Sequence, residues 1–206
     1  MTIKLGVLAL AEPDKGGTYQ YTLSMLQALH HTSGYEITLY GDPENADFAR
    51  LGYPIRRFTE SRAQQLIGLI ADRIHVRLPD AFDSQDILLA PIYSPALLHT
   101  SKPFAFTLHD LQEKYYPENF SWWQRIWRHQ VYARLLGRTR YVICESRQVK
   151  ADIIRFFGVF EERAVVITAP PLRQFFTDET GDRLQAAWGI RCIADTVSSA
   201  RRTAIR

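Results

Sequence analysis

His109 and Asp110 are the residues best placed for chemistry, because they follow the apolar run Phe104–Leu108. That run has the length and composition of a buried strand, and open α/β sheets bind their ligands beyond the carboxyl ends of the strands. An imidazole there forms hydrogen bonds with ligand hydroxyl groups, and the carboxylate beside it does the same or fixes the tautomer of the ring. Taken alone, the pair fits a histidine that caps a loop equally well. Glu113 lies just beyond and is predicted to line the same cleft.

A second polar turn contains Gly16 and Gly17 and separates the apolar run Ile3–Leu10 from a helical pattern. Glycines let the backbone come close to a ligand, and the free N–H groups of the helix start that follows attract an anion such as phosphate. The spacing is neither the dinucleotide fingerprint nor a Walker loop. The alternative interpretation is a tight turn into a helix that Thr18 caps.

The segment from Ser121 to Arg140 holds five arginines, no acidic residue and three tryptophans. Ser121 is predicted to cap a helix that runs to about Leu136 and ends at Gly137. The favoured interpretation is an ordinary packed helix whose arginines face solvent. The alternative is an amphipathic helix in peripheral contact with an anionic membrane. In the favoured interpretation the stripe that faces the core consists of Trp123, Ile126, Trp127 and Val131.

Apolar runs and helical patterns alternate along the chain, which predicts an α/β fold with a Rossmann-like, mostly parallel sheet and helices on both faces. The predicted strands are Ile3–Leu10, Tyr35–Tyr40, Ile55–Phe58, Asp86–Ala90, Phe104–Leu108, Tyr141–Cys144 and Ala164–Thr168. The predicted helices are Thr18–His31, Ala63–Arg73, Ser121 to about Leu136, and Ser146 to about Phe157.

Charge and cysteine usage narrow the function classes. The formal net charge of +3 comes from residues 189–206, which hold four arginines and one aspartate, so nucleic acid is not an expected partner. Cys144 and Cys192 have neither metal-ligand spacing nor a disulfide framework, and no metal site is predicted. Cys144 ends an apolar strand pattern and is predicted to be a buried small hydrophobe. A reducing, cytoplasmic setting is expected.

The order of these segments resembles the N-terminal domain of a family-4 glycosyltransferase with the GT-B architecture. The resemblance covers roughly residues 3–176 and is most specific in the segments HDLQ–YYPENF and ICES–VKADI. The matching stretches are AEPDKGGTYQYTLSMLQAL, LAPIYSPALL, FAFTLHDLQEKYYPENFS, and ICESRQVKADIIRFFGV followed by VVITAPPL.

The resemblance implies transfer of a hexose-type residue from a nucleotide-sugar to a saccharide or lipid-linked acceptor. Such enzymes typically retain the anomeric configuration without a metal ion, and the nucleotide-sugar is a substrate, so no cofactor is expected. By the same resemblance, Gly16 and Gly17 approach the sugar-phosphate of the donor and His109 contacts the transferred sugar. Asp110 and Glu113 are the further substrate contacts.

The expected organisation is one glycosyltransferase-type domain over residues 1–176 and an atypical, loosely attached tail over residues 177–206. Family members continue into a second Rossmann-like domain with a basic pair facing the diphosphate and an acidic motif with two glutamates. The sequence after Trp188 contains neither feature, so the chain is expected to be a truncated, acceptor-side half, and its activity alone is not implied. The second function left open is a non-catalytic sugar- or nucleotide-binding Rossmann module.

Overall fold

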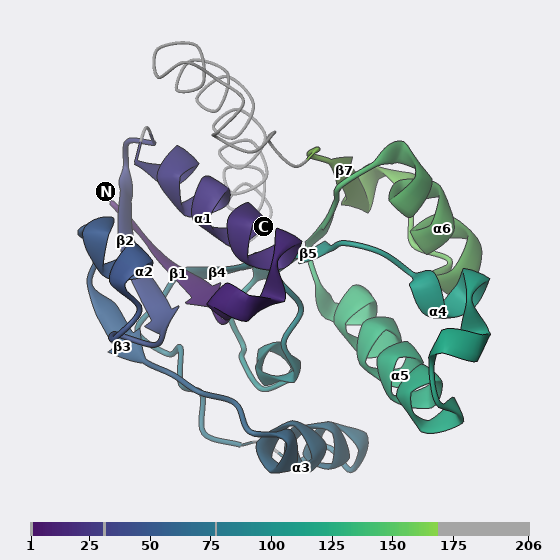
Figure 1. The fold of residues 1–206 in the computed structure, drawn as a ribbon. Helices are drawn as coiled ribbons and strands as arrows, with labels where there is room; N and C mark the ends of the chain where they lie inside the picture. The colour runs from purple at the N-terminus through teal and green to yellow at the C-terminus, as the bar shows by residue number, and fades with distance from the viewer. Residues whose placement is uncertain (1, 31, 77, 169–206) are drawn as a thin grey trace.

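A computed structural model describes residues 2–30, 32–76 and 78–168 of the chain (Figure 1). Seven parallel strands form one sheet in the order β3-β2-β1-β4-β5-β6-β7, which confirms the predicted Rossmann-like fold. The order reverses between β1 and β4, the switch point at which such sheets bind ligands. The strands are β1 (Ile3–Ala9), β2 (Tyr35–Gly41), β3 (Ile55–Arg57), β4 (Ile87–Ala90), β5 (Phe104–Leu108), β6 (Tyr141–Cys144) and β7 (Ala164–Val166).

The long helices lie where the apolar periodicity predicts them. Two short helices, α2 and α4, were not predicted, because one turn of helix is too short to show an apolar period. The helices are α1 (Gly17–Leu29), α2 (Ala46–Arg50), α3 (Arg62–Arg73), α4 (Gln112–Tyr115), α5 (Trp122–Arg138) and α6 (Arg147–Phe157). Between β4 and β5 the chain makes only a 3₁₀ turn, η2 (Pro95–Leu98).

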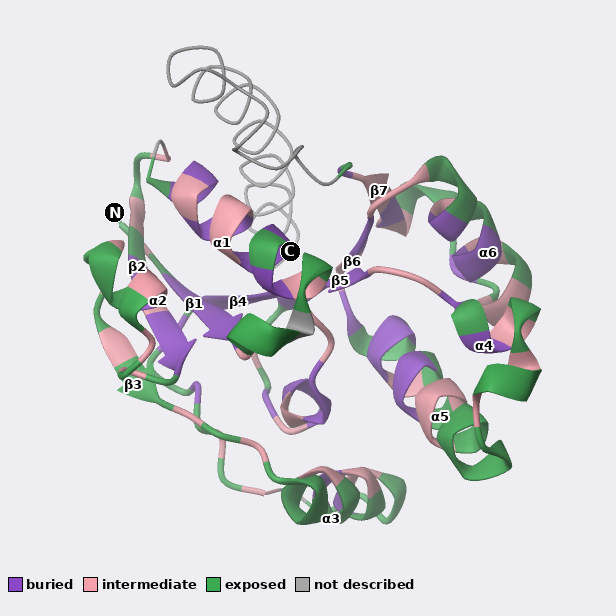
Figure 2. Cartoon of the chain, in the orientation of Figure 1, coloured by how far each residue is buried: buried purple, intermediate pink, exposed green. Residues whose placement is uncertain are grey.

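Helices cover both faces of the sheet, as predicted. Successive residues of a strand point to opposite faces, so each strand contributes to two cores. Val7 and Ala9 of β1 join the core under α1 and α2, whereas Leu8 joins the core under α5 and α6. Figure 2 shows the buried strands between these two groups of helices. Cys144 of β6 is fully buried, as predicted, and this burial raises the pKa of its thiol to about 12.

Two predicted helix starts are confirmed by their caps. The Ser121 hydroxyl accepts a hydrogen bond from Gln124 N at 3.2 Å, and Gln124 Oε1 accepts one from Ser121 N at 2.8 Å, so α5 begins with a capping box. Ser146 caps α6 by accepting a hydrogen bond from Val149 N at 3.1 Å. That helix ends at Gly158, whose φ of 64° is the left-handed conformation that favours glycine.

Two predicted helix boundaries are wrong. Gly16, not Thr18, caps α1, because the Gly16 carbonyl already accepts a hydrogen bond from Gln20 N at 3.1 Å. Gly137 does not end α5, which continues to Arg138 and has Thr139 as its C-cap.

The predicted core stripe of the 121–140 helix is wrong in its first half. Trp123 and Ile126 are 55% and 46% exposed, and Trp127 is only partly buried. The first turns of α5 lie farthest from the sheet, and no strand covers them there (Figure 2). The buried face lies in the second half of the helix and consists of Val131, Tyr132, Leu135 and Leu136.

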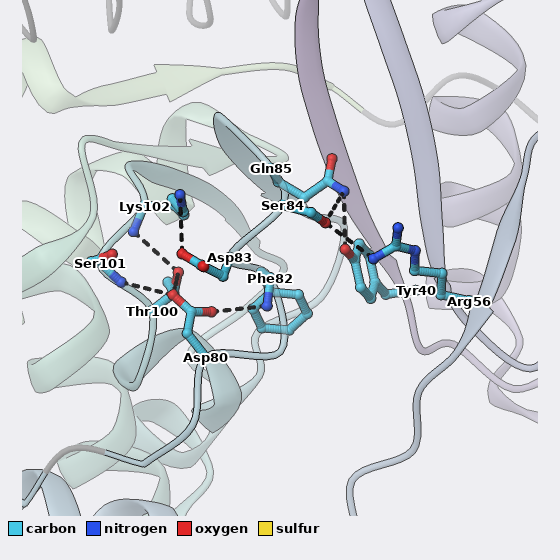
Figure 3. Close-up of polar contacts among 10 residues, drawn as sticks. All are labelled: Tyr40, Arg56, Asp80, Phe82, Asp83, Ser84, Gln85, Thr100, Ser101 and Lys102. Carbon is cyan, nitrogen blue, oxygen red and sulfur yellow. Dashed lines mark hydrogen bonds and ion pairs between the residues drawn. The ribbon is translucent and has the colours of Figure 1, made fainter.

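Polar contacts tie together the loops at the amino ends of β4 and β5 (Figure 3). The Asp80 carboxylate accepts hydrogen bonds from the Thr100 hydroxyl at 2.8 Å and from Ser101 N at 3.2 Å. Lys102 Nζ lies 3.4 Å from Asp83 Oδ1. These contacts stabilise the edge of the sheet opposite to the predicted site, so we assign them a structural role.

The predicted domain boundary at residue 176 and the predicted loose tail, 177–206, lie outside the described residues.

Candidate functional site at the carboxyl edge of the sheet

His109 follows β5 directly and bridges the loops of both neighbouring strands. Its Nε2 lies 2.9 Å from the carbonyl oxygen of Pro91, the residue after β4. Its Nδ1 lies 2.8 Å from Oε1 of Glu145, the residue after β6. The ring also meets the edge of Tyr21 from α1, with 5.0 Å between the ring centroids. Four elements therefore hold the imidazole at the carboxyl edge of the sheet, with 15% of its side chain exposed.

The glycine turn lies at the same edge, which confirms the prediction that it shares this edge with His109. Gly16 follows β1 and has φ 55° and ψ −114°, a conformation that L side chains rarely adopt. α1 then carries Tyr21, whose hydroxyl lies 3.2 Å from Thr107 Oγ1. A Cβ on Gly16 or Gly17 would meet no atom of the described chain within 4 Å. Gly16 is thus required by its backbone, whereas no steric conflict within the described chain requires Gly17.

Asp110 and Glu113 converge on one cation, Arg128 of α5. Arg128 Nη2 lies 3.1 Å from Asp110 Oδ1, and its Nε lies 3.0 Å from Glu113 Oε2. The guanidinium carbon also lies over the Phe120 ring, 5.2 Å from its centroid. The Asp110 side chain is 44% exposed, but that of Glu113 is 1% exposed. Glu113 therefore anchors the loop after β5 to α5, and its contact with substrate stays a prediction, as do those of Asp110, His109 and the glycines.

Glu145 is not among the site residues predicted from the sequence, although the sequence contains a signal for it. It follows the predicted strand Tyr141–Cys144 just as His109 follows its own strand, and the same strand-end rule applies to both. The structure joins the two side chains. Glu145 also acts on Tyr21: burial raises the pKa of the Tyr21 phenol well above its ordinary value, and the negative charge of Glu145 adds to the effect.

A groove of about 480 Å³ lies between α3 and α5 and shares Arg128 with the site. Four of its nine lining residues are aromatic, and Figure 1 shows both helices in the lower half of the view. The lining includes Leu66, Tyr93, Phe120, Trp123, Trp127 and Arg128. The groove therefore lies between the facing sides of the two helices and reaches the site through Arg128.

Metal-ligand clusters and membrane-spanning helices are both absent from the described part of the chain. No group of three His, Cys, Asp or Glu side chains lies together in a way that could hold a metal ion. None of the described helices is long and apolar enough to cross a bilayer.

Solved structures with a similar fold are proteins about twice as long. HepE from Anabaena, solved with UDP and glucose, is 16% identical with a TM-score of 0.50, over 81% of this chain and 44% of HepE. MnaA from S. aureus, solved with UDP, is 12% identical with a TM-score of 0.57, over 87% of this chain and 48% of MnaA. A UDP-N-acetylglucosamine 2-epimerase from Rickettsia bellii is 9% identical with a TM-score of 0.50, over 89% and 51% of the two chains.

At these identities the likeness shows the fold, which is one half of the GT-B architecture, and the chain spans about half the length of these neighbours. No curated protein matches the sequence. The family profile described as Glycosyltransferase Family 4 matches residues 15–169, which is more than half of the chain. The chain belongs to glycosyltransferase family 4.

Proposed function

We propose that this chain forms the acceptor-side half of an enzyme that transfers a hexose-type residue from a nucleotide-sugar to a saccharide or lipid-linked acceptor. The observation that carries the proposal is the convergence of His109 and the glycine turn at one carboxyl edge, beside the switch point between β1 and β4. In open α/β sheets, ligands bind in this position, beyond the carboxyl ends of the strands at the switch point.

The roles divide along this edge. The helix start at Gly16 and Gly17 attracts the negative charge of the donor diphosphate, since its backbone N–H groups point away from the helix. His109 and Asp110 contact the hydroxyl groups of the sugar, and Arg128 holds Asp110 in place at 3.1 Å. Transfer with retention requires positioning and stabilisation of the departing diphosphate, and the nucleotide-sugar serves as substrate.

The neighbours support the donor class. The structures of HepE with UDP and glucose and of MnaA with UDP contain the nucleotide or sugar parts of such donors. We therefore propose UDP-sugars as the first donors to test, with UDP-glucose as the initial probe.

We expect the 206-residue chain alone to bind ligand without turnover, because it spans about half the length of its structural neighbours. Removing even one preorganised group that stabilises a leaving oxyanion costs on the order of 10²–10³ in rate. The measurement is UDP release from UDP-glucose by the purified chain, with and without glucose as acceptor. Turnover that His109→Ala abolishes would show that this half suffices.

A non-catalytic sugar- or nucleotide-binding module is the second candidate, because polar groups at the carboxyl edge of a parallel sheet also bind ligands without turnover. Titrating UDP-glucose into the chain, and into the chain mixed with a separately expressed donor domain of a family-4 enzyme, separates the two. Binding by the chain with no turnover in the mixture supports the module. Turnover only in the mixture supports the acceptor-side half.

We further propose a peripheral membrane contact through α5, with α3 beside it. Trp122 and Trp123 are 68% and 55% exposed, and Ile67 and Ile70 of α3 are 55% and 51% exposed. Arg125 adds positive charge to the same end of α5. Exposed tryptophan and aliphatic side chains beside arginines fit an anionic lipid surface, where indole rings settle at the headgroup level.

The test is co-sedimentation with vesicles of phosphatidylglycerol and, separately, of phosphatidylcholine. The wild-type chain is expected to bind the anionic vesicles, and the double variant Trp122→Glu with Trp123→Glu to lose binding. Phe160→Glu is the matched control, because Phe160 is 67% exposed on a different part of the surface. Equal binding by the double variant and the control would exclude α5 from the contact.

A further inference from the structure

The groove between α3 and α5 has the size and the lining of a small-molecule site. Its volume of about 480 Å³ falls within the roughly 300–1,000 Å³ that is usual for ligand pockets. Four aromatic rings share the lining with two glutamines and two arginines, and Leu66 is its one aliphatic residue within the described part of the chain. Such a lining offers flat apolar contact together with a few directional hydrogen bonds.

Two of the aromatic rings are held in place by the core. Tyr93 and Trp127 are partly buried and pack against the core beneath α5 and α6. The Tyr93 ring meets the fully buried Tyr132 ring edge-on, with 4.9 Å between the ring centroids. Because the protein has already ordered these two rings, a ligand that stacks on them pays little entropy for doing so.

Polar atoms of the groove remain available to a ligand. Gln124 uses its Oε1 for the capping box, and within the described residues its amide nitrogen has no hydrogen bond. Gln65 donates through Nε2 to Glu60 at 3.4 Å, which leaves its Oε1 as an acceptor. Arg62, the first residue of α3, forms no ion pair with any other described residue. The groove therefore offers donors and an acceptor, which is what hydroxyl groups require.

The groove is connected to the loops that hold His109. Tyr93 lies two residues after Pro91, whose carbonyl oxygen is 2.9 Å from His109 Nε2. Arg128 lines the groove and lies 3.1 Å from Asp110, the neighbour of His109. A ligand in the groove therefore reaches the loops after β4 and β5, where the transferred sugar is proposed to lie.

We infer that this groove binds the acceptor, and that the acceptor part it holds is a saccharide. The sugar rings stack on Trp127 and Tyr93, and their hydroxyl groups bond to Gln65, Gln124 and Arg62. This inference rests on the proposed function and narrows it, since that function leaves a saccharide and a lipid-linked acceptor open. The contact of His109 with the transferred sugar is unchanged by it.

The chemistry of the lining decides between a sugar and a hydrocarbon chain. One face of a pyranose ring presents C–H groups, whose partial positive charge suits the negative face of an aromatic ring, while its hydroxyl groups project around the rim. A hydrocarbon chain would cover the same aromatic rings but would leave the amide and guanidinium groups desolvated without partners, which costs free energy. The groove therefore fits a saccharide better than a lipid tail.

The first experiment measures binding of maltose and of cellobiose to the full chain by calorimetry. Leu66→Trp fills the groove and is expected to abolish the binding seen with the wild type. Ile67→Trp is the matched control, because Ile67 is 55% exposed on the same helix and lies outside the groove lining. Equal binding by the two variants would overturn the inference, and so would a wild-type chain that binds neither disaccharide.

The second experiment tests the aromatic platform. Trp127→Ala is expected to weaken disaccharide binding about tenfold or more, since it removes a stacked ring. Trp122→Ala is the control, because Trp122 is 68% exposed on the same helix outside this groove. A dispersed amide spectrum shows that each variant is folded, and the Leu66→Trp result decides the matter if Trp127→Ala is not. Equal binding by the two folded tryptophan variants would contradict the stacking.

A lipid probe and a donor probe separate the alternatives. Farnesyl phosphate that binds to the wild type but not to Leu66→Trp, in a chain that binds no disaccharide, would assign the groove to a lipid tail and overturn the inference. Disaccharide binding in a chain that binds no UDP-glucose would support the groove but contradict the proposed function. UDP-glucose binding without disaccharide binding would keep the proposed function and overturn the groove assignment.

Discussion

At the carboxyl edge of the sheet, backbone conformation and hydrogen-bond acceptors determine which residue a position requires. Gly16 is required because its φ of 55° and ψ of −114° suit glycine alone, whereas Gly17 begins α1 in helical conformation. His109 is held because the carbonyl oxygen of Pro91 and a carboxylate oxygen of Glu145 lie close to its two ring nitrogens. The fold therefore requires glycine at position 16, whereas position 17 remains available for contact with a ligand.

The two glycines are predicted to differ when each is replaced by alanine. Gly16→Ala places a Cβ in a strained backbone conformation and should lower the free energy of unfolding by about 1–3 kcal/mol. Gly17→Ala meets no atom of the described chain within 4 Å and should leave stability unchanged or slightly higher, because alanine favours the helix. Urea denaturation of both variants measures the difference. An equal loss of stability in both would contradict the backbone argument.

If the phosphate of the donor lies against the backbone at Gly17, the Gly17→Ala variant should bind UDP-glucose more weakly than the wild type, although its free energy of unfolding is unchanged. Unchanged binding would leave the glycine turn a structural feature and remove it from the proposed site.

At the scale of elements, α5 is divided into two halves with different tasks. Its second half packs against the sheet, and its first half presents Trp122 and Trp123 to the surface. Asp72 of α3 fixes the relative position of the two helices, since it lies 3.0 Å from Arg134 and 3.6 Å from Arg138. The groove between α3 and α5 exists because this pairing holds two partly apolar helices side by side without burying them.

Because only the second half of α5 is buried, two large-to-small substitutions are expected to change stability by very different amounts. Leu135→Ala opens a cavity in a fully buried position and should cost about 2–5 kcal/mol of the free energy of unfolding. Trp122→Ala removes a side chain that is 68% exposed and should change stability by no more than about 0.5 kcal/mol. Thermal unfolding of both variants tests the assignment. A large loss for Trp122→Ala would mean that this face is covered in the protein in solution.

At the scale of the whole molecule, two cores on either side of one sheet leave polar groups at places where helices meet loops. His99 follows η2 and packs against Gly68 of α3, so that a Cβ on Gly68 would lie 2.8 Å from His99 Nε2. Burial lowers the pKa of His99 below its ordinary value. Burial also lowers the pKa of His129 on α5, and the charge of Lys114 adds to that effect.

Lowered histidine pKa values predict that stability falls on acidification. The unfolded chain takes up a proton at His99 and His129 near pH 6.5, whereas the folded chain takes it up only at lower pH. The folded state is therefore stabilised above pH 6.5 and loses this contribution as the pH falls below that value. His99→Gln should flatten the decline in thermal midpoint between pH 7 and pH 5. An unchanged slope would show that other groups cause the decline.

The sequence alone determined the parallel α/β fold, the positions of the long helices and the family, because apolar periodicity, helix caps and strand-end motifs are local signals. It also placed His109 and Gly16 at one edge, since parallel strands end on the same side. The tertiary structure decided which side chains from neighbouring elements contact the site residues. Only packing pairs His109 with Glu145, buries Glu113 against Arg128 and leaves the first turns of α5 exposed. Contacts between residues distant in sequence depend on how the helices pack against the sheet, and a local sequence pattern does not determine that packing.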